Sequence, residues 1–298
     1  MRIAVTGKQG QVVTAMAQRA SGFDVDLIAI GRPEMDLLEE ESILHSLRAL
    51  KPDVIVSAAA YTAVDKAESE PELAFAINAA GAGAVAKAAS NLDIPVLHLS
   101  TDYVFDGRKD FPYVEEDPTH PISVYGASKL EGEQRVAATT DNHVILRTAW
   151  VYSANGSNFL KTMLRLAETR DEISVVADQL GRPTSADDIA DALFRIALRV
   201  HSNPDRRLRG TFHLAADGEA SWAAFAETIF EEVKKRTGRL TRIKSITTAD
   251  YPTPANRPGN SRLSTDKLAA IYGIRLPHWR ISTCGVLDTL IGVEKKEK

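Results

Sequence analysis

The sequence predicts a doubly wound α/β fold, in which helices cover both faces of a parallel β-sheet, together with a second, smaller α/β domain. Two observations support this fold class. Short runs of β-branched and aliphatic residues alternate with stretches in which apolar residues recur at helical spacing. The expected strands are apolar along their whole length, which is typical of strands buried on both faces of a parallel sheet.

The first half of the chain carries the regular part of this alternation. Residues 2–6 form a β-branched run that ends at a glycine, and residues 11–20 follow with helical spacing. Right-handed crossovers join such units into one sheet. Further strands are expected at residues 25–30, 54–58, 96–99 and 144–146. Further helices are expected at residues 40–50, 71–90 and 124–137.

The rhythm changes after Trp150, where the expected strands become fewer and isolated. The segment 250–264 is rich in proline and turn residues and predicts long loops. We therefore expect a first domain at residues 1–150 and a second at 151–298, from which some segments return to the first. The second half should contain strands at 173–176 and 211–214 and helices at 159–168, 186–199, 222–236, 265–272 and 283–291.

The composition excludes several classes of protein. The 298 residues carry a formal net charge of −4, so no general basic field is present and nucleic acid is not an expected partner. The single cysteine, Cys284, excludes an intramolecular disulfide and a multi-cysteine metal site. No signal peptide is recognisable and no stretch approaches the ~20 apolar residues that span a bilayer. We therefore expect a cytoplasmic protein without a membrane partner.

A glycine turn lies between the first expected strand and the first expected helix. The free backbone N–H groups and the positive end of the helix dipole meet at this turn, and together they suit an anionic diphosphate. Its glycines, Gly7 and Gly10, have the spacing of a dinucleotide-binding turn, although Val13 replaces the third glycine. The dinucleotide contacts expected from this turn are Gly7, Gln9, Gly10, Gln11 and Val12.

The end of the second expected strand bears on the choice of dinucleotide. An acidic residue at this point commonly binds the ribose 2′-hydroxyl of NADH, whereas this chain has Arg32, which suits the 2′-phosphate of NADPH. Asp36 keeps NADH open. We expect Arg32, Asp36 and Leu37 to border the ribose, with NADPH favoured and NADH possible.

Two polar groups of residues indicate a reducing centre. Ser100, Thr101 and Asp102 follow a buried strand and lie at the carboxyl edge of the sheet, where ligands bind in this architecture. Tyr125 and Lys129 are four residues apart in an expected helix and share one face. We expect the nearby ammonium to lower the pKa of the phenol, so that Tyr125 exchanges a proton while Thr101 donates a second hydrogen bond.

With these motifs in order, the chain resembles the dTDP-4-dehydrorhamnose reductase family of extended short-chain dehydrogenases, which have a Rossmann domain. The resemblance extends almost from end to end. The segments that carry it in the first half and at the domain boundary are 58–68, 77–78, 100–107, 147–152 and 178–184. The segments that carry it in the second half are 210–214, 221–222, 225–226 and 257–261.

The resemblance implies an activity and its partners. It implies reduction, with NADPH or NADH, of the 4-keto group of dTDP-4-dehydro-6-deoxy-L-mannose to dTDP-L-rhamnose, within dTDP-rhamnose biosynthesis. The partner is then a small dTDP-sugar, and a homodimer is possible. Residues 1–150 would bind the cofactor, and residues 151–298 would mainly bind the sugar nucleotide.

The resemblance also assigns roles to residues of this chain. It implies that Tyr125 protonates the C4 oxygen of the sugar, Lys129 binds the nicotinamide ribose and Thr101 orients the carbonyl, while Asp102 contacts the sugar. The further cofactor contacts that it implies are Ala58, Ala59, Ala60, Tyr61, Ser100, Tyr125 and Lys129. The implied substrate contacts are Thr62, Asp102, Tyr103, Trp150, Arg182 and Arg257. The two arginines suit a diphosphate, because a guanidinium binds it as a planar fork.

No metal is expected. Some members of the family bind magnesium at a dimer contact through acidic residues, one of them early in the first helix. Residues 12–17 of this chain contain no carboxylate, and Asp187 and Asp188 are interpreted as favourable charges at a helix start.

The sequence leaves two other functions open. One is reduction or epimerisation of another nucleotide-linked 6-deoxyhexose, because the motifs fix the reaction better than the stereochemistry of one carbon. The other is a catalytically silent regulatory subunit, similar to the one that accompanies methionine adenosyltransferase. The presence of Thr101, Asp102, Tyr125 and Lys129 favours an enzyme.

Overall fold

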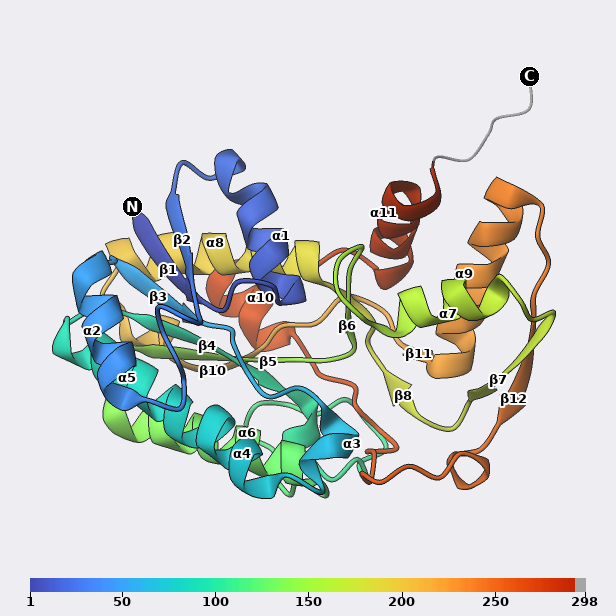
Figure 1. Cartoon of the computed structure of the whole chain (residues 1–298), viewed down its shortest axis with the longest axis horizontal. Helices are drawn as coiled ribbons and strands as arrows, with labels where there is room; N and C mark the ends of the chain where they lie inside the picture. The colour runs from blue at the N-terminus through green and yellow to red at the C-terminus, as the bar shows by residue number, and fades with distance from the viewer. Residues whose placement is uncertain (293–298) are drawn as a thin grey trace.

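A parallel sheet of six strands forms the larger lobe of the molecule, as Figure 1 shows. The structure is a computed structural model that describes residues 1–292. The spatial order of the strands is β10-β5-β4-β3-β1-β2, with every neighbouring pair parallel. The strands are β1 (Arg2–Thr6), β2 (Asp26–Ile30), β3 (Val54–Ser57), β4 (Val96–Thr101), β5 (His143–Thr148) and β10 (Gly210–His213). The doubly wound fold predicted from the sequence is confirmed.

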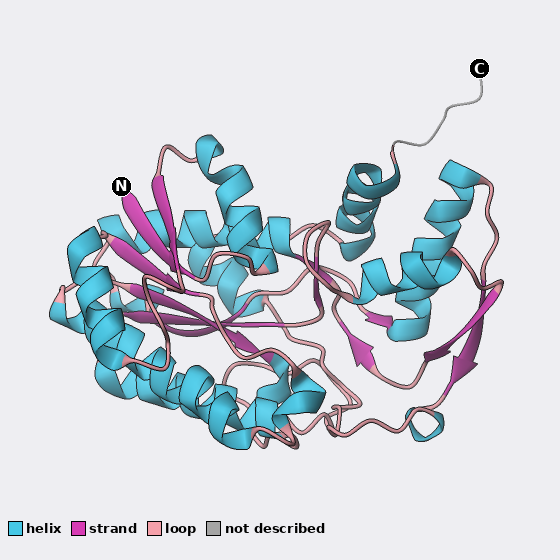
Figure 2. Ribbon diagram, viewed as in Figure 1, coloured by secondary structure: helices cyan, strands magenta, loops and turns pink. Residues whose placement is uncertain are grey.

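Helices cover both faces of this sheet, as Figure 2 shows. Alternate residues of one strand point to opposite faces: Ile3 and Val5 belong to the apolar cluster of the first face, whereas Ala4 belongs to that of the second. The first face is covered by α1 (Gln11–Arg19), α8 (Ala186–Ser202) and α10 (Asp266–Tyr272). The second face is covered by α2 (Glu40–Leu50), α5 (Ala82–Asn91) and α6 (Val124–Thr139).

One long helix crosses the second face. It comprises α4 (Pro71–Phe75), the π-helical turn η2 (Ala76–Gly81) and α5. This is the one helix within residues 1–292 whose 21 residues are long and apolar enough to cross a membrane by length and composition, and 56% of its most apolar window is buried. The expectation that no stretch reaches this length is therefore wrong. The helix is apolar because it packs on the sheet and against the neighbouring helix α6.

The smaller lobe has its own apolar core, built around Tyr152, Phe225 and Trp279. Its helices are α7 (Phe159–Ala167), α9 (Trp222–Thr237) and α11 (Trp279–Ile291), and its parallel strands are β7 (Glu172–Val176) and β12 (Arg242–Ile246). The sequence did not predict β12, and α11 begins four residues before the expected start. The expected second domain ran to residue 298, whose last six residues lie outside the described part of the chain.

The second half of the chain returns to the sheet lobe, and the remaining elements are short. Both α8 and β10 come from the second half of the chain yet pack in the sheet lobe. The short strands are β6 (Val151–Tyr152), β8 (Leu180–Gly181), β9 (Thr184–Ser185) and β11 (Ala220–Ser221). The short helices are η1 (Ala20–Gly22), α3 (Val64–Ala67), η3 (Asp102–Val104), η4 (Arg206–Leu208) and η5 (Thr248–Asp250).

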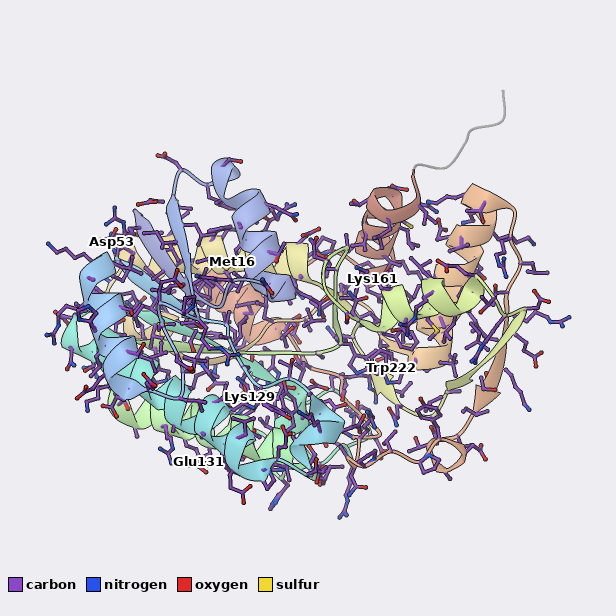
Figure 3. All side chains as sticks on the ribbon, viewed as in Figure 1. Met16, Asp53, Lys129, Glu131, Lys161 and Trp222 are labelled. Atoms are coloured by element: carbon purple, nitrogen blue, oxygen red, sulfur yellow. The ribbon has the colours of Figure 1, made fainter. Side chains whose placement is uncertain are left out.

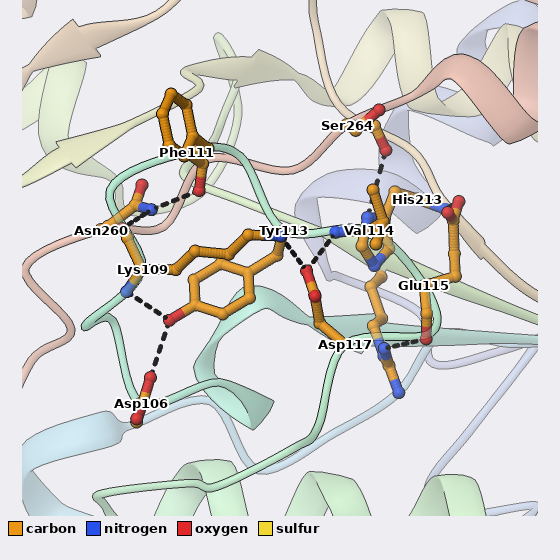
Figure 4. Close-up of polar contacts among 11 residues, drawn as sticks. Asp106, Lys109, Phe111, Tyr113, Val114, Glu115, Asp117, His213, Asn260 and Ser264 are labelled. Atoms are coloured by element: carbon orange, nitrogen blue, oxygen red, sulfur yellow. Dashed lines mark hydrogen bonds and ion pairs between the residues drawn. The ribbon is translucent and has the colours of Figure 1, made fainter.

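A hydrogen-bonded loop after η3 joins distant parts of the chain, as Figure 4 shows. The side-chain amide of Asn260 donates to the carbonyl oxygens of Lys109 at 2.6 Å and Phe111 at 2.9 Å. The backbone N–H of His213 donates to Glu115 at 2.8 Å. These bonds hold the segment around Asn260 beside η3, at the carboxyl edge of the sheet where Asp102 lies.

Candidate active site

A cleft of about 710 Å³ opens at the carboxyl ends of β1, β3 and β4 and reaches the smaller lobe. The strand order reverses at β1, which lies between β2 and β3, and ligands of doubly wound folds bind at such a point. The residues named from the sequence that line this cleft are Gly7, Gln9, Gly10, Gln11, Val12, Ala58, Ala59, Ala60, Thr62, Ser100, Thr101, Asp102, Tyr103, Tyr125, Lys129 and Trp150. Those that do not line it are Arg32, Asp36, Leu37, Tyr61, Arg182 and Arg257.

The glycine turn has the geometry of an anion cradle. Gly7 has φ +97°, and a Cβ there would lie 3.4 Å from the Cβ of Ala59. Gly10 caps α1 without a side-chain hydrogen bond, and the first turn of α1 contains no acidic residue. The first-turn N–H groups therefore suit the diphosphate of a dinucleotide. Val13, which replaces the third glycine of the fingerprint, is buried at 3% exposure in the core beneath this turn.

The residues expected at the ribose lie beyond the edge of the cleft. Arg32 is exposed immediately after β2. Lys8 in the glycine turn forms an ion pair with the exposed Glu34. The carboxylate of Asp36 accepts a hydrogen bond from the backbone N–H of Leu38 at 3.0 Å, and Leu37 packs beside the cluster under α2 and α5.

The loop after β3 is held in place by side chains on both sides. The hydroxyl oxygen of Thr6 accepts hydrogen bonds from the backbone N–H groups of Ala58 at 3.0 Å and Ala59 at 2.9 Å. Asn78, in the π-helical turn, accepts from the N–H of Tyr61 at 2.7 Å and donates to its carbonyl at 3.0 Å. The sequence assigned Asn78 no role in the site, although the motif Ile77-Asn78 carries part of the family resemblance.

Tyr125 lies half-buried on the first turn of α6, with its ring centroid 5.6 Å from that of Tyr103. Burial raises the pKa of Tyr125 to about 12, and a hydrogen bond with Thr101 opposes this rise. The expectation that Lys129 lowers this pKa is therefore wrong. Removal from water destabilises the phenolate more than the surrounding groups stabilise it, so the phenol stays protonated at neutral pH.

Lys129 is buried one turn after Tyr125, and its ammonium is directed elsewhere. The Nζ atom donates to the carbonyl oxygen of Leu99 at 2.7 Å and lies 3.4 Å from Nε2 of His98. Burial lowers the pKa of Lys129 to about 8, against the attraction of Glu133. Figure 3 places Lys129 where α6 passes the sheet. The same helix thus brings a neutral phenol and a fixed cation to one end of the cleft.

A buried ion pair lies behind Lys129. Arg147 of β5 binds both carboxylate oxygens of Glu133 in α6, at 2.9 and 2.7 Å. The hydroxyl of Ser100 donates to the same carboxylate at 2.5 Å. Because both partners of the ion pair are at most 6% exposed, this pair fixes α6 to the sheet directly behind the cleft.

Asp102 presents an unpaired carboxylate oxygen in the cleft wall. Its Oδ1 accepts a hydrogen bond from the hydroxyl of Thr101 at 3.0 Å. Its Oδ2 is buried and has no hydrogen-bond partner among the described residues. Burial raises the pKa of Asp102 to about 6, although the nearby hydroxyls of Ser261 and Thr101 oppose the rise. A buried acceptor of this kind suits a hydroxyl donor of a ligand.

The smaller lobe adds an aromatic residue that the sequence did not assign to the site. Trp222, at the start of α9, lines the cleft and stacks on Trp150 with ring centroids 3.5 Å apart. Figure 3 shows Trp222 on the side of the smaller lobe. The signal in the sequence was the motif Ser221-Trp222. The other lining residues that were missed are Val13, Val64, Leu99, Thr148, Val151, Gly156 and Ser157.

The two arginines expected at a diphosphate have protein partners. Arg257 pairs with Asp65 at 2.7 Å and also donates to Thr253. Arg182 donates to the carbonyl of Ala216 at 3.4 Å, while its buried Nε has no hydrogen-bond partner in the described part of the chain. Between residues 1 and 292, no group of three or more His, Cys, Asp or Glu side chains could hold a metal ion.

Known proteins resemble this chain over nearly its whole length. It matches the family described as RmlD substrate binding domain over residues 1–291. A dTDP-4-dehydrorhamnose reductase of Sinorhizobium fredii is 58% identical over 95% of both chains, and one of Escherichia coli is 44% identical over 97% of this chain and 98% of its own.

Solved structures agree with these matches. A dTDP-4-dehydrorhamnose reductase from Clostridium acetobutylicum has a TM-score of 0.90 and 37% identity, covering 97% of this chain and 99% of its own. One from Bacillus anthracis, in complex with NADP, has a TM-score of 0.90 and 32% identity with the same coverage. The chain therefore belongs to the RmlD substrate binding domain family, the family of the dTDP-4-dehydrorhamnose reductases.

Proposed function

We propose that this chain uses NADPH to reduce the 4-keto group of dTDP-4-dehydro-6-deoxy-L-mannose, giving dTDP-L-rhamnose. The observation that carries the proposal is the meeting of Thr101, Tyr125 and Lys129 in a cleft that begins at the glycine turn. The membership of the family, with named reductases at 44–58% identity, supports the same reaction.

The residues of the chain have distinct parts in this reaction. When bound, NADPH supplies the hydride that adds to C4 of the sugar. Tyr125 donates the proton to the C4 oxygen, and its raised pKa means that the proton is present at neutral pH. Thr101 turns its hydroxyl from Asp102 to donate a second hydrogen bond to that oxygen, and Lys129 binds the nicotinamide ribose.

The proposed cofactor site runs from the glycine turn to the carboxyl end of β4. The first-turn N–H groups of α1 hold the diphosphate. The ribose and the nicotinamide lie along the loop after β3, which contains Ala58, Ala59, Ala60 and Tyr61. The exposed cations Lys8 and Arg32 favour the 2′-phosphate of NADPH. NADH remains a usable cofactor in this proposal, with Asp36 and Leu37 beside the ribose.

The proposed substrate site lies at the other end of the cleft. Thr62, Asp102, Tyr103 and Trp150 face the sugar, with the unpaired Oδ2 of Asp102 accepting from a sugar hydroxyl. Arg182 and Arg257 are proposed to bind the diphosphate, which requires Arg257 to exchange Asp65 for the ligand. In this division, residues 1–150 mainly bind the cofactor and residues 151–298 mainly bind the sugar nucleotide.

The experiment follows cofactor oxidation by the purified chain. NADPH and then NADH are supplied with freshly generated dTDP-4-dehydro-6-deoxy-L-mannose, and the product is compared with dTDP-L-rhamnose by chromatography. Oxidation with that product supports the proposal. A different sugar product identifies a reductase or epimerase of another 6-deoxyhexose. Cofactor binding without oxidation identifies a silent regulatory subunit instead.

Two further properties belong to the proposal. The chain is proposed to act in the cytoplasm on a small molecule, without a nucleic-acid or membrane partner. A homodimer is proposed from the family resemblance, and sedimentation velocity measures it directly. A sedimentation coefficient of a monomer at micromolar concentration would contradict the dimer without affecting the proposed reaction.

A further inference from the structure

Trp150 is held in a backbone conformation that few residues with a side chain adopt. Its φ is +48°, in the left-handed region, which costs free energy for a residue other than glycine. The carbonyl oxygen of Trp150 accepts a hydrogen bond from the N–H of Thr184 at 3.1 Å. The side chain of Trp150 lines the cleft, where two neighbouring residues cover its ring.

One face of the Trp150 indole lies against the backbone of Gly181. A Cβ on Gly181 would lie 2.3 Å from Cε2 of the ring and 2.6 Å from both Cζ2 and Nε1. Nearly equal distances to three bonded ring atoms place Gly181 over the face of the ring. Only glycine permits this approach, because any side chain would collide with a rigid indole.

The opposite face is covered by Trp222. The two ring planes differ by 7°, with centroids 3.5 Å apart, so Trp222 covers its face fully and Gly181 must occupy the other. Trp150 therefore presents only its edge to a ligand. Stacked aromatic pairs add stabilisation beyond the area that they bury.

Trp222 is itself held firmly by the smaller lobe. It is the first residue of α9, whose N-cap Ser221 accepts a hydrogen bond from the N–H of Ala224 at 3.0 Å. Its indole Nε1–H donates to the side chain of Gln179 at 3.2 Å, and Phe159 packs beside it with centroids 4.6 Å apart. Through this stack, the smaller lobe fixes the position of the Trp150 ring, which belongs to the sheet lobe.

We propose that Trp222 is a positioning residue for the reduction, which clamps Trp150 so that the edge of its indole meets the hexose in one orientation. In this way Trp222 sets C4 of the sugar against Tyr125 without contributing to the binding of NADPH. The inference rests on the function proposed above and adds a residue from the other lobe to the reacting end of the cleft.

A double-mutant cycle tests this inference. Trp222→Leu should lower kcat/KM for the sugar nucleotide about tenfold, while Trp222→Phe, which keeps a stacking ring, should lower it less than about threefold. The dissociation constant for NADPH should change by less than about twofold in both. Because Trp222 acts through Trp150, Trp222→Leu should have almost no further effect in a Trp150→Leu background.

Far-UV circular dichroism supplies a readout that does not depend on turnover. Two stacked indoles couple and give a paired positive and negative band, which Trp150→Leu and Trp222→Leu should both abolish. Trp279→Phe is the matched control, because Trp279 packs on Phe225 and not on another tryptophan. If Trp222→Leu does not fold, Gln179→Met, which removes the acceptor for the indole N–H, should weaken both the band and kcat/KM.

Three results would overturn the inference. One is a tenfold loss that persists in the Trp150→Leu background, which would mean that Trp222 contacts the substrate itself. Another is an unchanged kcat/KM in Trp222→Leu despite loss of the paired band. The third is a wild-type spectrum without the band. Failure of the wild-type chain to reduce the sugar would instead reject the proposed function and is measured first.

Discussion

At the scale of single residues, the site separates a proton donor from a fixed cation on one helix. Tyr125 and Lys129 lie one turn apart on α6, yet the ammonium donates to the carbonyl of Leu99 rather than to the phenol. The phenol therefore keeps its proton until a substrate oxygen accepts it. This arrangement suits reduction, because the proton must arrive together with the hydride.

Tyr125→Phe should separate chemistry from binding. The variant should bind NADPH as the wild type does, and its turnover should fall by roughly 10²–10⁴-fold, the usual contribution of general-acid catalysis. Fluorescence titration gives the binding constant, and single-turnover oxidation of NADPH gives the rate. Unchanged turnover would remove Tyr125 from the mechanism.

Asp102 should make the stability of the fold depend on pH. Its pKa rises from an ordinary 3.8 to about 6, so the folded state holds this proton more tightly than the unfolded chain. The free energy of unfolding therefore falls as pH rises from about 4 to about 6, by roughly 3 kcal/mol from this group. Urea titrations at pH 4 and pH 7 should show Asp102→Asn gaining stability relative to the wild type at pH 7 alone. An equal difference at both pH values would contradict the raised pKa.

At the scale of elements, the position of α6 depends on close packing at one glycine. A Cβ on Gly132 would lie 2.2 Å from the carbonyl oxygen of Asn78 in the π-helical turn. Gly132→Ala should therefore push α6 outward, cost about 1–3 kcal/mol in urea and also lower turnover, because α6 carries Tyr125. Gly285→Ala is the control: it lies exposed in α11 with nothing within 4 Å, so alanine should stabilise by about 1 kcal/mol. If Gly132→Ala were as stable as the wild type, the contact between α6 and the π-helical turn would have space for the added methyl group.

The buried ion pair between α6 and β5 should matter far more than an exposed pair on the same helix. Glu133→Gln leaves Arg147 buried without its charged partner and should cost about 3–5 kcal/mol. Glu131, labelled in Figure 3, pairs with Arg135 on the exposed side of α6, so Glu131→Gln should cost less than about 0.5 kcal/mol. Chemical denaturation of both variants measures the difference. Similar losses would mean that solvent reaches the inner pair.

The sequence predicted most elements because their patterns are local. Helices with a strong 3.6-residue period and strands with continuous apolar runs, such as β1 and α2, begin and end as predicted. It missed β12, which has only two apolar residues among five, none of them buried, and which pairs with the distant β7. The target of the Lys129 ammonium and the stack of Trp222 on Trp150 also depend on segments far apart in the chain. The pattern of residues within one element does not predict contacts between such distant segments.

At the scale of the whole molecule, the cleft joins two lobes with separate apolar cores. The sheet lobe supplies the glycine turn and α6, while the smaller lobe supplies Trp222 from α9. A ligand that fills the cleft therefore stabilises the contact between the lobes as well as each lobe. Binding to the folded state alone raises stability in proportion to the logarithm of ligand concentration.

NADPH should accordingly raise the melting temperature of the protein. At a concentration of 100 times its dissociation constant, the gain is about 2.7 kcal/mol, or roughly 4 °C for a chain of this size. Tyr125→Phe should show the same rise, because the phenol takes part in proton transfer rather than in binding of the diphosphate.

Adding dTDP should raise the melting temperature further, since the sugar nucleotide is proposed to occupy the other end of the cleft. Differential scanning calorimetry measures the melting temperature in each of these three experiments. No shift with NADPH would reject the glycine turn as the cofactor site, whereas a shift with NADPH but none with dTDP would reject only the proposed site for the sugar nucleotide.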